Sequence, residues 1–362
     1  MDVQDVELDE SLWAKARGLG GEQYPLVRHL LDSAAMAMFL WDEYLTVSQR
    51  AVICAGFGRV NQPDEARSLV GLCAGLHDVG KISGFQFCDR SAAEGLTAGL
   101  LGDVGKIGDA HVRHDVAGMR ATTAVLKALG FDGEVDPDDW DGPVGRIAEV
   151  VGGHHGRFHR YEALFSSAAY EPLLGGAMWA EQRASHARAV HTVLGAPAMP
   201  GKFGAPAAVL VTGVVVLADW LVSQEGYVRE RCGLPRAGLS EHFARSCTDA
   251  ERLVRDAGLM PVTLTRKPFA AAYGIKGNPN ALQRSLASEL PRVLAEMPRE
   301  EEGAAAAAGI LVVTAAPGDG KSEAALEAER VFSAQFGTRG FPSCCRRWRR
   351  VIRCIRGWPT PF

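Results

Sequence analysis

The chain has 362 residues, 47% of them hydrophobic, and a net charge of −4. This length holds two or three domains and the apolar content supports a sizeable core, which excludes disorder of the whole chain. The small negative charge argues against a uniformly basic nucleic-acid binder and restricts any DNA contact to local patches. The eight cysteines form no CxxC pair, so they indicate neither a zinc ribbon nor a disulfide framework and favour a reducing cytoplasm.

The sequence contains no segment that predicts export or insertion into a membrane. Its acidic start lacks the charged-then-apolar order of a signal peptide. The longest apolar run, 205–218, is interrupted by Pro206, Thr212 and Gly213 and is shorter than a membrane span. We therefore expect a cytoplasmic protein without a membrane partner.

Residues 10–130 predict successive helices separated by breaks that carry glycine or proline. The expected helices run over 13–19, 25–44, 64–76 and 117–129. Between the last two, residues 85–110 are rich in glycine and small polar residues and predict an irregular loop that could gate substrate. The acidic segment 132–140 favours a solvated linker over a calcium loop, and 144–151 predicts another helix.

Beyond residue 220 the pattern becomes more polar. Residues 227–259 predict charged helix, and 260–268 predict an extended connector, which places a domain boundary near 260–270. The compact run 310–314 is rich in β-branched residues and predicts a buried strand.

The most informative local feature is the adjacent pair His77 and Asp78, followed by Gly80 and Lys81. Such a pair offers one neutral nitrogen and one anionic oxygen, and its carboxylate can bridge two cations. His-Asp pairs also arise by chance, and a hydrogen-bonded pair at a helix end is the alternative. Further candidate ligands occur in order along the chain: His29, His114, His154, His155 and Asp219.

Several of these candidates have alternatives. His154 and His155 would point about 100° apart in a regular helix, so they converge only if the backbone bends, as the flanking glycines permit. The alternative is a surface turn with two solvated histidines. His111 competes with His114, and Asp219 could simply cap a helix.

Lys81 lies one turn after His77 and could contact a scissile phosphate, although a lysine extending over the surface is the competing interpretation. The remaining histidines are expected at the surface; they are His159, His186, His191 and His242.

A second motif, residues 315–322, follows the predicted strand and precedes a helical pattern. Its Gly318, Gly320, Lys321 and Ser322 match a phosphate-binding Walker A loop, in which backbone N–H groups hold phosphates, the lysine meets the β- and γ-phosphates and the serine meets Mg²⁺. The motif departs from the usual pattern at its first position, Ala315.

The ordered histidines and aspartates resemble the HD metal-dependent phosphohydrolase superfamily, over roughly residues 20–225. The segments around 75–81, 113–118, 152–157 and 217–221 look more specifically like the HD nuclease domain of the CRISPR-associated nuclease-helicase of type I systems. This resemblance implies an all-helical bundle that degrades the displaced DNA strand after recruitment by the CRISPR surveillance (Cascade-type) complex.

The resemblance also implies the roles of the ligands. Asp78 would bridge two divalent ions, with His29, His77 and Asp219 on one and His114, His154 and His155 on the other. Asp78 is therefore expected to be catalytic, and Lys81 is expected to be catalytic from its place one turn after His77. A histidine-rich site favours transition metals such as Mn, Fe, Co, Ni or Zn over Mg.

The second half of that family is a superfamily 2 helicase, which tolerates alanine at the first Walker A position. Asn278–Gln283 looks like the adenine-reading motif of these helicases, with Gln283 as the reader. ATP with Mg²⁺ is therefore expected as a ligand only if this helicase part is functional.

From Pro342 the chain carries six arginines and no acidic residue, which is typical of a frameshift in a GC-rich gene; a basic DNA-binding tail is the alternative. The sequence holds no acidic Mg²⁺ motif or second RecA-like lobe after the loop, so we expect a truncated helicase without unwinding activity.

The prediction is thus a mainly α fold, an HD helical bundle followed by the truncated start of an α/β RecA-like domain. The expected parts are a nuclease domain at 1–260, a connector with the glutamine motif at 261–298, an incomplete RecA-like domain at 299–341 and an aberrant tail at 342–362. The expected function is a metal-dependent endonuclease that prefers single-stranded DNA. A nucleotide or cyclic-nucleotide phosphohydrolase and a non-catalytic, unstable remnant are the alternatives.

Overall fold

The structure is a computed structural model that describes residues 7–104, 107, 113–131, 141–159, 171–260, 268, 271–272, 274, 277–296 and 311–336. The chain divides into two units, one of residues 1–45 and 49–257 and the other of residues 46–48 and 258–362. The predictions for His111, the acidic segment 132–140, Ile310 and the tail 342–362 lie outside the described residues, as does most of the connector 260–268.

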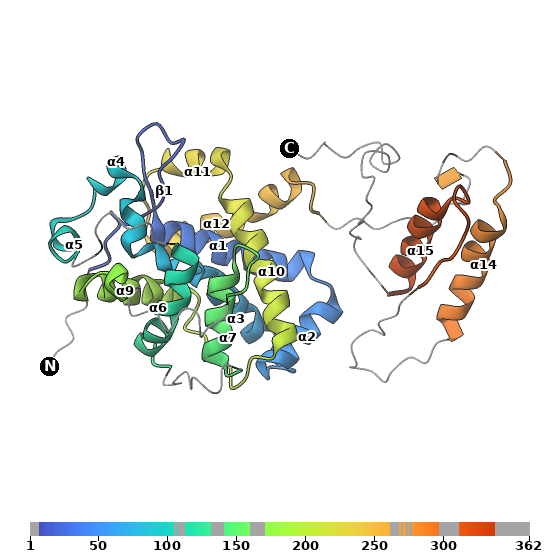
Figure 1. Ribbon diagram of the computed structural model, residues 1–362, viewed down its shortest axis with the longest axis horizontal. Coiled ribbons are helices and arrows are strands. Elements are labelled where there is room, and N and C mark those ends of the chain that lie inside the picture. Colours follow the sequence, from blue (N-terminus) through green and yellow to red (C-terminus); the bar gives the residue numbers. More distant parts are fainter. Residues whose placement is uncertain are drawn as a thin grey trace. The chain divides into compact units, whose positions relative to one another are not determined.

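The first unit is a bundle of helices with one small two-stranded sheet (Figure 1). This confirms the predicted mainly α fold. Its described elements are β1 (Trp13–Lys15), β2 (Tyr24–Pro25), α1 (Leu26–Phe39), a π-helical extension (Leu40–Tyr44), α2 (Val47–Phe57), α3 (Pro63–Leu76), two 3₁₀ helices (Val79–Lys81 and Gly84–Cys88), α4 (Arg90–Ala93), α5 (Ala98–Gly102), α6 (His114–Ala128), α7 (Pro143–Gly153), a 3₁₀ helix (Glu171–Leu174), α9 (Ala177–Val193), α10 (Ala205–Val222), α11 (Glu225–Cys232) and α12 (Leu239–Asp256).

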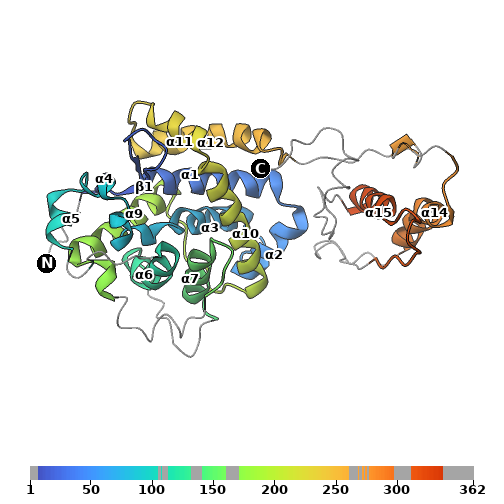
Figure 2. The same cartoon turned by 45° about the horizontal axis from the view of Figure 1, so that its top comes forward.

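Helix α1 lies at the centre of this bundle. It packs against α3, α10 and α12, and in Figure 2 it runs beside α12 with α3 beneath it. Residues 26–38 are all buried, because apolar side chains occupy every side of the helix. The same burial carries the polar residues Arg28, His29 and Asp32 into the interior, where each needs a partner.

Several predicted helices agree closely with the structure. The segment 25–44 forms α1 and its π-helical extension, 64–76 forms α3, and 144–151 lies within α7. Both α3 and α7 begin at a proline, whose missing N–H costs nothing in the first turn. Helix α6 begins at His114, three residues before the predicted start.

The expected helix at 13–19 is wrong. Trp13–Lys15 instead forms strand β1, which pairs antiparallel with β2, and glycines with positive φ at 18, 20 and 21 follow it. These glycines adopt a backbone conformation that ends a helix and turns the chain back, so the segment pairs with β2 instead.

The prediction of an irregular loop at 85–110 is wrong in part, because short helical elements cover 84–88, 90–93 and 98–102. Further helices differ from prediction. Helix α2 was not predicted, and the single helix expected at 227–259 is split into α11 and α12 around Gly233, Pro235 and Gly238.

Helix α10 is the one described helix that is long and apolar enough to cross a membrane. Pro206 lies in its first turn, and Thr212 and Gly213 continue the helix. However, 56% of its apolar window is buried inside the unit, as in the core helix of a helical domain. Its burial also brings Asp219, near its end, into the bundle.

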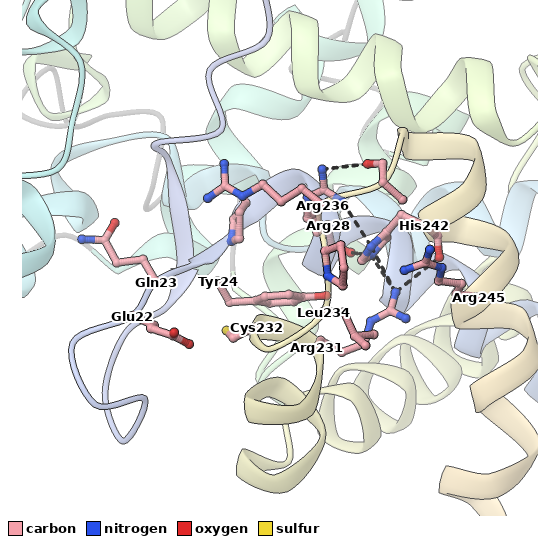
Figure 3. Close-up of a pocket in the computed structure, with 13 residues that line it drawn as sticks. Glu22, Gln23, Tyr24, Arg28, Arg231, Cys232, Leu234, Arg236, His242 and Arg245 are labelled. Atoms are coloured by element: carbon pink, nitrogen blue, oxygen red, sulfur yellow. Dashed lines mark hydrogen bonds between the residues drawn. The ribbon is translucent and has the colours of Figure 1, made fainter.

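A buried network of charged and polar groups joins α1 to α11 and α12. Asp32 Oδ1 accepts hydrogen bonds from His242 Nε2 (2.9 Å), the Arg231 guanidinium (3.1 Å) and Ser246 Oγ (2.6 Å). His242 lies between Arg231 and Arg28 beside a cavity of about 230 Å³ (Figure 3). The predicted surface position of His242 is therefore wrong, as is that of the fully buried His186.

This network should make the free energy of unfolding depend on pH in the acidic range. His242, Arg231 and Ser246 outweigh the burial that would raise the pKa of Asp32, and they lower it to about 2. Asp32 therefore contributes about 2 kcal/mol to the free energy of unfolding above pH 4, and this contribution is lost as the pH falls towards 2. In urea titrations from pH 7 to pH 2, Asp32→Asn should lack this part of the pH dependence. The exposed control Asp256→Asn should keep it, and equal slopes for all three proteins would contradict the assignment.

The second unit contains two described helices, α14 (Ala281–Glu296) and α15 (Lys321–Phe336), which pack against each other. Leu286, Leu290 and Leu294 of α14 meet Ala324, Ala328 and Val331 of α15. The strand predicted at 310–314 does not form in its described residues, 311–314, where Val312 is 77% exposed. A strand needs a neighbour to satisfy its backbone, and none lies beside this segment in the described part of the unit.

Candidate metal centre

The pair His77 and Asp78 lies where α3 ends. His77 caps the helix and Asp78 has φ −99° and ψ 9°, outside the helical range, before the 3₁₀ helix Val79–Lys81 begins. The backbone of that 3₁₀ helix approaches the first turns of α6 very closely. A Cβ atom on Gly80 would lie 2.0 Å from the His114 carbonyl oxygen, so only glycine fits there. This contact brings Asp78 next to His114.

The first group of candidate ligands comprises His29 from α1, His77, Asp78 and Asp219 from α10. Their ligand atoms lie within 4.8 Å of one another, and all four residues are buried. His29 Nε2 is 3.2 Å from Asp219 Oδ1 and 3.3 Å from Asp78 Oδ2. Asp219 lies within the last turn of α10 and accepts a hydrogen bond from Ser223 Oγ (2.6 Å), so it does not act as a helix cap.

The second group comprises His114, His154 and His155, whose ligand atoms also lie within 4.8 Å of one another. His114 Nε2 is 2.9 Å from His155 Nε2 and 3.4 Å from His154 Nε2. Asp78 faces this group with its other oxygen, since Oδ1 is 3.3 Å from His114 Nε2 and 3.6 Å from His154 Nε2. The carboxylate of Asp78 therefore lies between the two groups.

The two adjacent histidines converge because the backbone bends. Helix α7 ends at Gly153, His154 forms its C-cap, and Gly156 has a φ of +77°. The rings of His154 and His155 lie 4.2 Å apart between centroids. His154 is fully buried and only His155 is exposed, so the alternative of two solvated histidines is wrong for His154.

Hydrogen bonds to the backbone orient two of the rings. The Nδ1 atoms of His77 and His154 lie 2.7 and 2.6 Å from the carbonyl oxygens of Ala74 and Val151. An Nδ1–H that donates to each carbonyl leaves the Nε2 lone pair facing Asp78, which is how metal-binding histidines are commonly oriented.

The buried ring nitrogens also include atoms without hydrogen bonds. Both ring nitrogens of His29 and Nε2 of His77 have none, although the two Nε2 atoms are within 3.5 Å of carboxylate oxygens. Buried polar atoms are normally satisfied, so unsatisfied lone pairs that converge on carboxylates fit a bound cation. The residues present therefore suit divalent metal ions, and the many nitrogens suit transition metals.

The electrostatics of the centre follow from burial and from its few charges. Burial would raise the pKa of Asp78, but Lys81, His77 and His114 hold it well below its usual value. Burial lowers the pKa of His77, yet Asp78 and Asp219 more than offset this and raise it to about 9. For His114 and His154 burial dominates and lowers the pKa to about 3 and about 4. His114 and His154 are thus neutral and able to bind a metal at neutral pH.

Lys81 is buried, and the alternative of a surface lysine is wrong. Its Nζ lies 2.6 Å from Asp78 Oδ2 and donates to the Ala14 carbonyl oxygen at 3.1 Å. The lysine therefore holds the Asp78 carboxylate and at the same time fixes β1 against the centre.

Three residues near the centre were not predicted as part of it. Lys15 lies on a segment expected to be helical, and its position depends on a strand pairing that no local pattern indicates. Asp115 follows His114 directly and is buried, and its carboxylate lies 3.1 Å from His159 Nε2. This contact joins the loop after His155 to the first turn of α6; the adjacency of Asp115 to His114 was the available signal.

The Asp115–His159 contact gives a prediction about the second group. His159→Ala should free the loop that carries His155 and weaken divalent-ion binding by the second group about tenfold, the usual scale for residues that orient ligands. Titration with Mn²⁺ monitored by calorimetry would measure this. The control is His191→Ala, which replaces a half-buried histidine on α9. Unchanged metal affinity of the second group in His159→Ala would contradict the orienting role of His159.

The second unit brings the predicted nucleotide-binding residues together in part. Gly318 and Gly320 have φ of +94° and +73°, and Lys321 begins α15. Gln283 and Asn280 exchange backbone and side-chain hydrogen bonds of 3.0 and 2.9 Å, and a Cβ on Gly320 would lie 2.7 Å from Gln283 Nε2. Gln283 thus lies against the glycine loop, while Ser322 is exposed at the start of the helix.

In the first unit, five helical segments of one bundle supply two groups of ligands that share the aspartate of a His-Asp pair. This fold and site define a metal-dependent hydrolase of the HD class. The sequence profile of the family described as "Cas3, HD domain" matches residues 13–228. The chain belongs to this family.

Individual relatives agree with this assignment. The "CRISPR-associated endonuclease/helicase Cas3" of Thermus thermophilus is 30% identical over 355 residues, which cover 94% of this chain and 34% of that protein. The crystal structure of T. fusca Cas3 with AMPPNP superposes with a TM-score of 0.70 and 32% identity, over 92% of this chain and 35% of that one. A chain in a structure described as "CRISPR RNA-guided surveillance complex, pre-nicking" superposes with a TM-score of 0.62 and 31% identity. The match covers 90% of this chain and 35% of that one. The chain thus spans about a third of the length of these relatives.

Proposed function

We propose that this chain is a metal-dependent endonuclease of CRISPR defence that hydrolyses phosphodiester bonds in single-stranded DNA. The observation that carries the proposal is the position of Asp78, whose two oxygens face two separate groups of ligands. A shared carboxylate is what a pair of metal ions about 3.5–4 Å apart requires. When bound, such ions supply a nucleophile from water at neutral pH and positive charge for the phosphate oxygens.

We assign the proposed ligands to two ions according to the two groups that they form in the structure. His29, His77 and Asp219 would hold one ion, His114, His154 and His155 would hold the other, and Asp78 would contact both. With five histidines among seven ligands, Mn, Fe, Co, Ni or Zn are preferred to Mg.

The protein's own residues prepare the centre for a phosphate. Lys81 holds Asp78 in one orientation, and the backbone carbonyls of Ala74 and Val151 fix two of the histidine rings. His155 and part of His114 are accessible while the other five ligands are buried, so substrate would reach the ligands from the side of the second group. This one-sided access favours a flexible single strand over a rigid duplex.

We propose further that residues 1–260 form the nuclease domain and that Gln283, Gly318, Gly320, Lys321 and Ser322 bind ATP. Support comes from the glycine conformations and from the T. fusca relative, whose structure contains AMPPNP. Because all seven ligands lie in the first unit, cutting should not require ATP. Recruitment by a Cascade-type surveillance complex and a cytoplasmic location are proposed from the relative in such a complex.

A cleavage assay with the purified chain tests the function. With Mn²⁺ or Ni²⁺ and without ATP, we expect a circular single-stranded DNA to be cut and the matching duplex to be cut at least about tenfold more slowly. A folded, metal-loaded chain that leaves the single strand intact would refute the proposal. Preferential hydrolysis of nucleotides or cyclic nucleotides in the same panel would favour the alternative phosphohydrolase. No hydrolysis of any substrate would favour a non-catalytic remnant.

A further inference from the structure

Lys15 is a second lysine at the metal centre, outside every motif identified in the sequence. It is the last residue of β1, and its Nζ lies 3.7 Å from Asp219 Oδ1. Lys81 holds the other aspartate of the first group in a similar way, at 2.6 Å from Asp78 Oδ2. Each aspartate of the centre therefore faces one lysine.

Buried hydrogen bonds fix the strand that carries Lys15. Gln86 accepts from the Trp13 N–H at 3.2 Å and donates to the carbonyl oxygens of Trp13 and Lys81, both at 3.0 Å. Lys81 donates to the carbonyl oxygen of Ala14, the residue next to Lys15. Gln86 is fully buried, so β1 is attached to the 3₁₀ helix that follows Asp78. This attachment fixes the backbone of Lys15 beside the centre.

The two lysines differ in how much of their binding capacity is used. The Lys81 side chain is 5% exposed, and both Asp78 and a carbonyl oxygen occupy its ammonium group. The Lys15 side chain is 27% exposed, and its contact with Asp219 is longer than a hydrogen bond. An ammonium group has three donors, so Lys15 keeps donors that can reach a ligand from solvent.

We propose that Lys15 is a further catalytic residue, whose ammonium group contacts a non-bridging oxygen of the scissile phosphate. This inference rests on the proposed nuclease function. Hydrolysis forms one P–O bond from water, breaks one P–O ester bond and leaves a proton on the departing oxygen. Lys15 keeps its own proton throughout and offsets the negative charge that grows on the phosphate oxygens.

The competing role is structural, with Lys15 only neutralising Asp219. The two roles differ in what a substitution changes. A partner of Asp219 alone would alter metal binding and stability, whereas a phosphate contact alters phosphate affinity and kcat with the metal still bound.

Three variants separate these roles. In Lys15→Ala the contact is removed, in Lys15→Arg the charge is kept, and Lys127→Ala removes an exposed lysine of α6 as a control. Metal content, melting temperature, kcat and KM for single-stranded DNA, and calorimetric binding of inorganic phosphate to the Mn²⁺-loaded full chain are measured for each. If Lys15→Ala does not fold, Lys15→Gln replaces it.

For Lys15→Ala we expect kcat/KM to fall roughly 10- to 100-fold, mainly in kcat, and phosphate affinity to fall about tenfold at unchanged metal content. Lys15→Arg should recover most of both, and Lys127→Ala should match the wild type. Unchanged kcat/KM and phosphate affinity in the loaded variant would overturn the inference, as would a loss of metal that accounts for the loss of activity. A wild type that binds phosphate through Lys15 but cuts no DNA would refute the proposed function alone.

Discussion

Asp78→Ala is expected to abolish DNA cutting, with kcat reduced roughly 10³-fold or more. Its carboxylate faces both sets of ligands, at 3.3 Å from His29 Nε2 on one side and from His114 Nε2 on the other. Its loss would remove the shared ligand of two ions, each of which contributes several kcal/mol of charge stabilisation. Cleavage of single-stranded DNA with Mn²⁺, together with the metal content of the variant, measures this.

Loss of activity through unfolding has to be separated from loss of the carboxylate. Removal of Asp78 leaves the buried Lys81 ammonium without its partner, which is costly. The double variant Asp78→Ala/Lys81→Met removes that charge as well and should melt closer to the wild type while remaining inactive. Asp64→Ala, exposed in the first turn of α3, is the control. Full activity in Asp78→Ala would indicate a contaminating nuclease and contradict the assignment.

The set of candidate ligands could be predicted because their chemistry is visible in residue types. His29, His77, Asp78 and Asp219 occur in the order that the HD resemblance implies, and the structure brings them together. What spacing alone could not give is the position of Asp78 between the two groups. That position depends on the turn after α3 and on the close approach of Gly80 to α6, both of which are tertiary features.

The errors in the prediction have a common physical origin in contacts between distant residues. His242 is buried because it meets Asp32, 210 residues away in sequence. Strand β1 pairs with β2, and the side chain of Gln86, 73 residues from Trp13, fixes it through hydrogen bonds to the Trp13 backbone. Local hydrophobic patterns carry no information about such partners, so a polar residue whose partner is distant is predicted at the surface or in the wrong element.

In the second unit the local motif was predicted correctly, but the strand before it was not. The glycine loop and the helix after it were predictable, since Gly318 and Gly320 have the positive φ that the motif requires. The run 311–314 has the composition of a strand but lacks a neighbouring strand in the described part of this unit, and it stays irregular. Composition therefore predicts what a segment can pair as, and the surrounding chain decides whether it pairs.

Gly80→Ala is expected to damage both the fold and the site by adding one methyl group. The new Cβ would lie 2.0 Å from the His114 carbonyl oxygen, 2.2 Å from the Gly118 nitrogen and 2.6 Å from the Gly118 Cα. These are backbone atoms of α6, which cannot rotate away, so the 3₁₀ helix and α6 must separate. Overpacking of this kind costs about 1–3 kcal/mol of the free energy of unfolding, or more where backbone has to move.

The same separation should impair catalysis, because Gly80 lies two residues after Asp78 and its clash is with the backbone of His114. A displacement of about 1 Å between groups that hold one site can reduce kcat about 100-fold. Urea unfolding and single-strand cleavage of Gly80→Ala measure the two losses. Gly102→Ala, exposed in α5 with no atom within 4 Å of the added Cβ, should be neutral in both assays. If Gly80→Ala melted and cut like the wild type, the close packing that holds Asp78 beside His114 could not exist in solution, and the shared position of Asp78 would lose its structural basis.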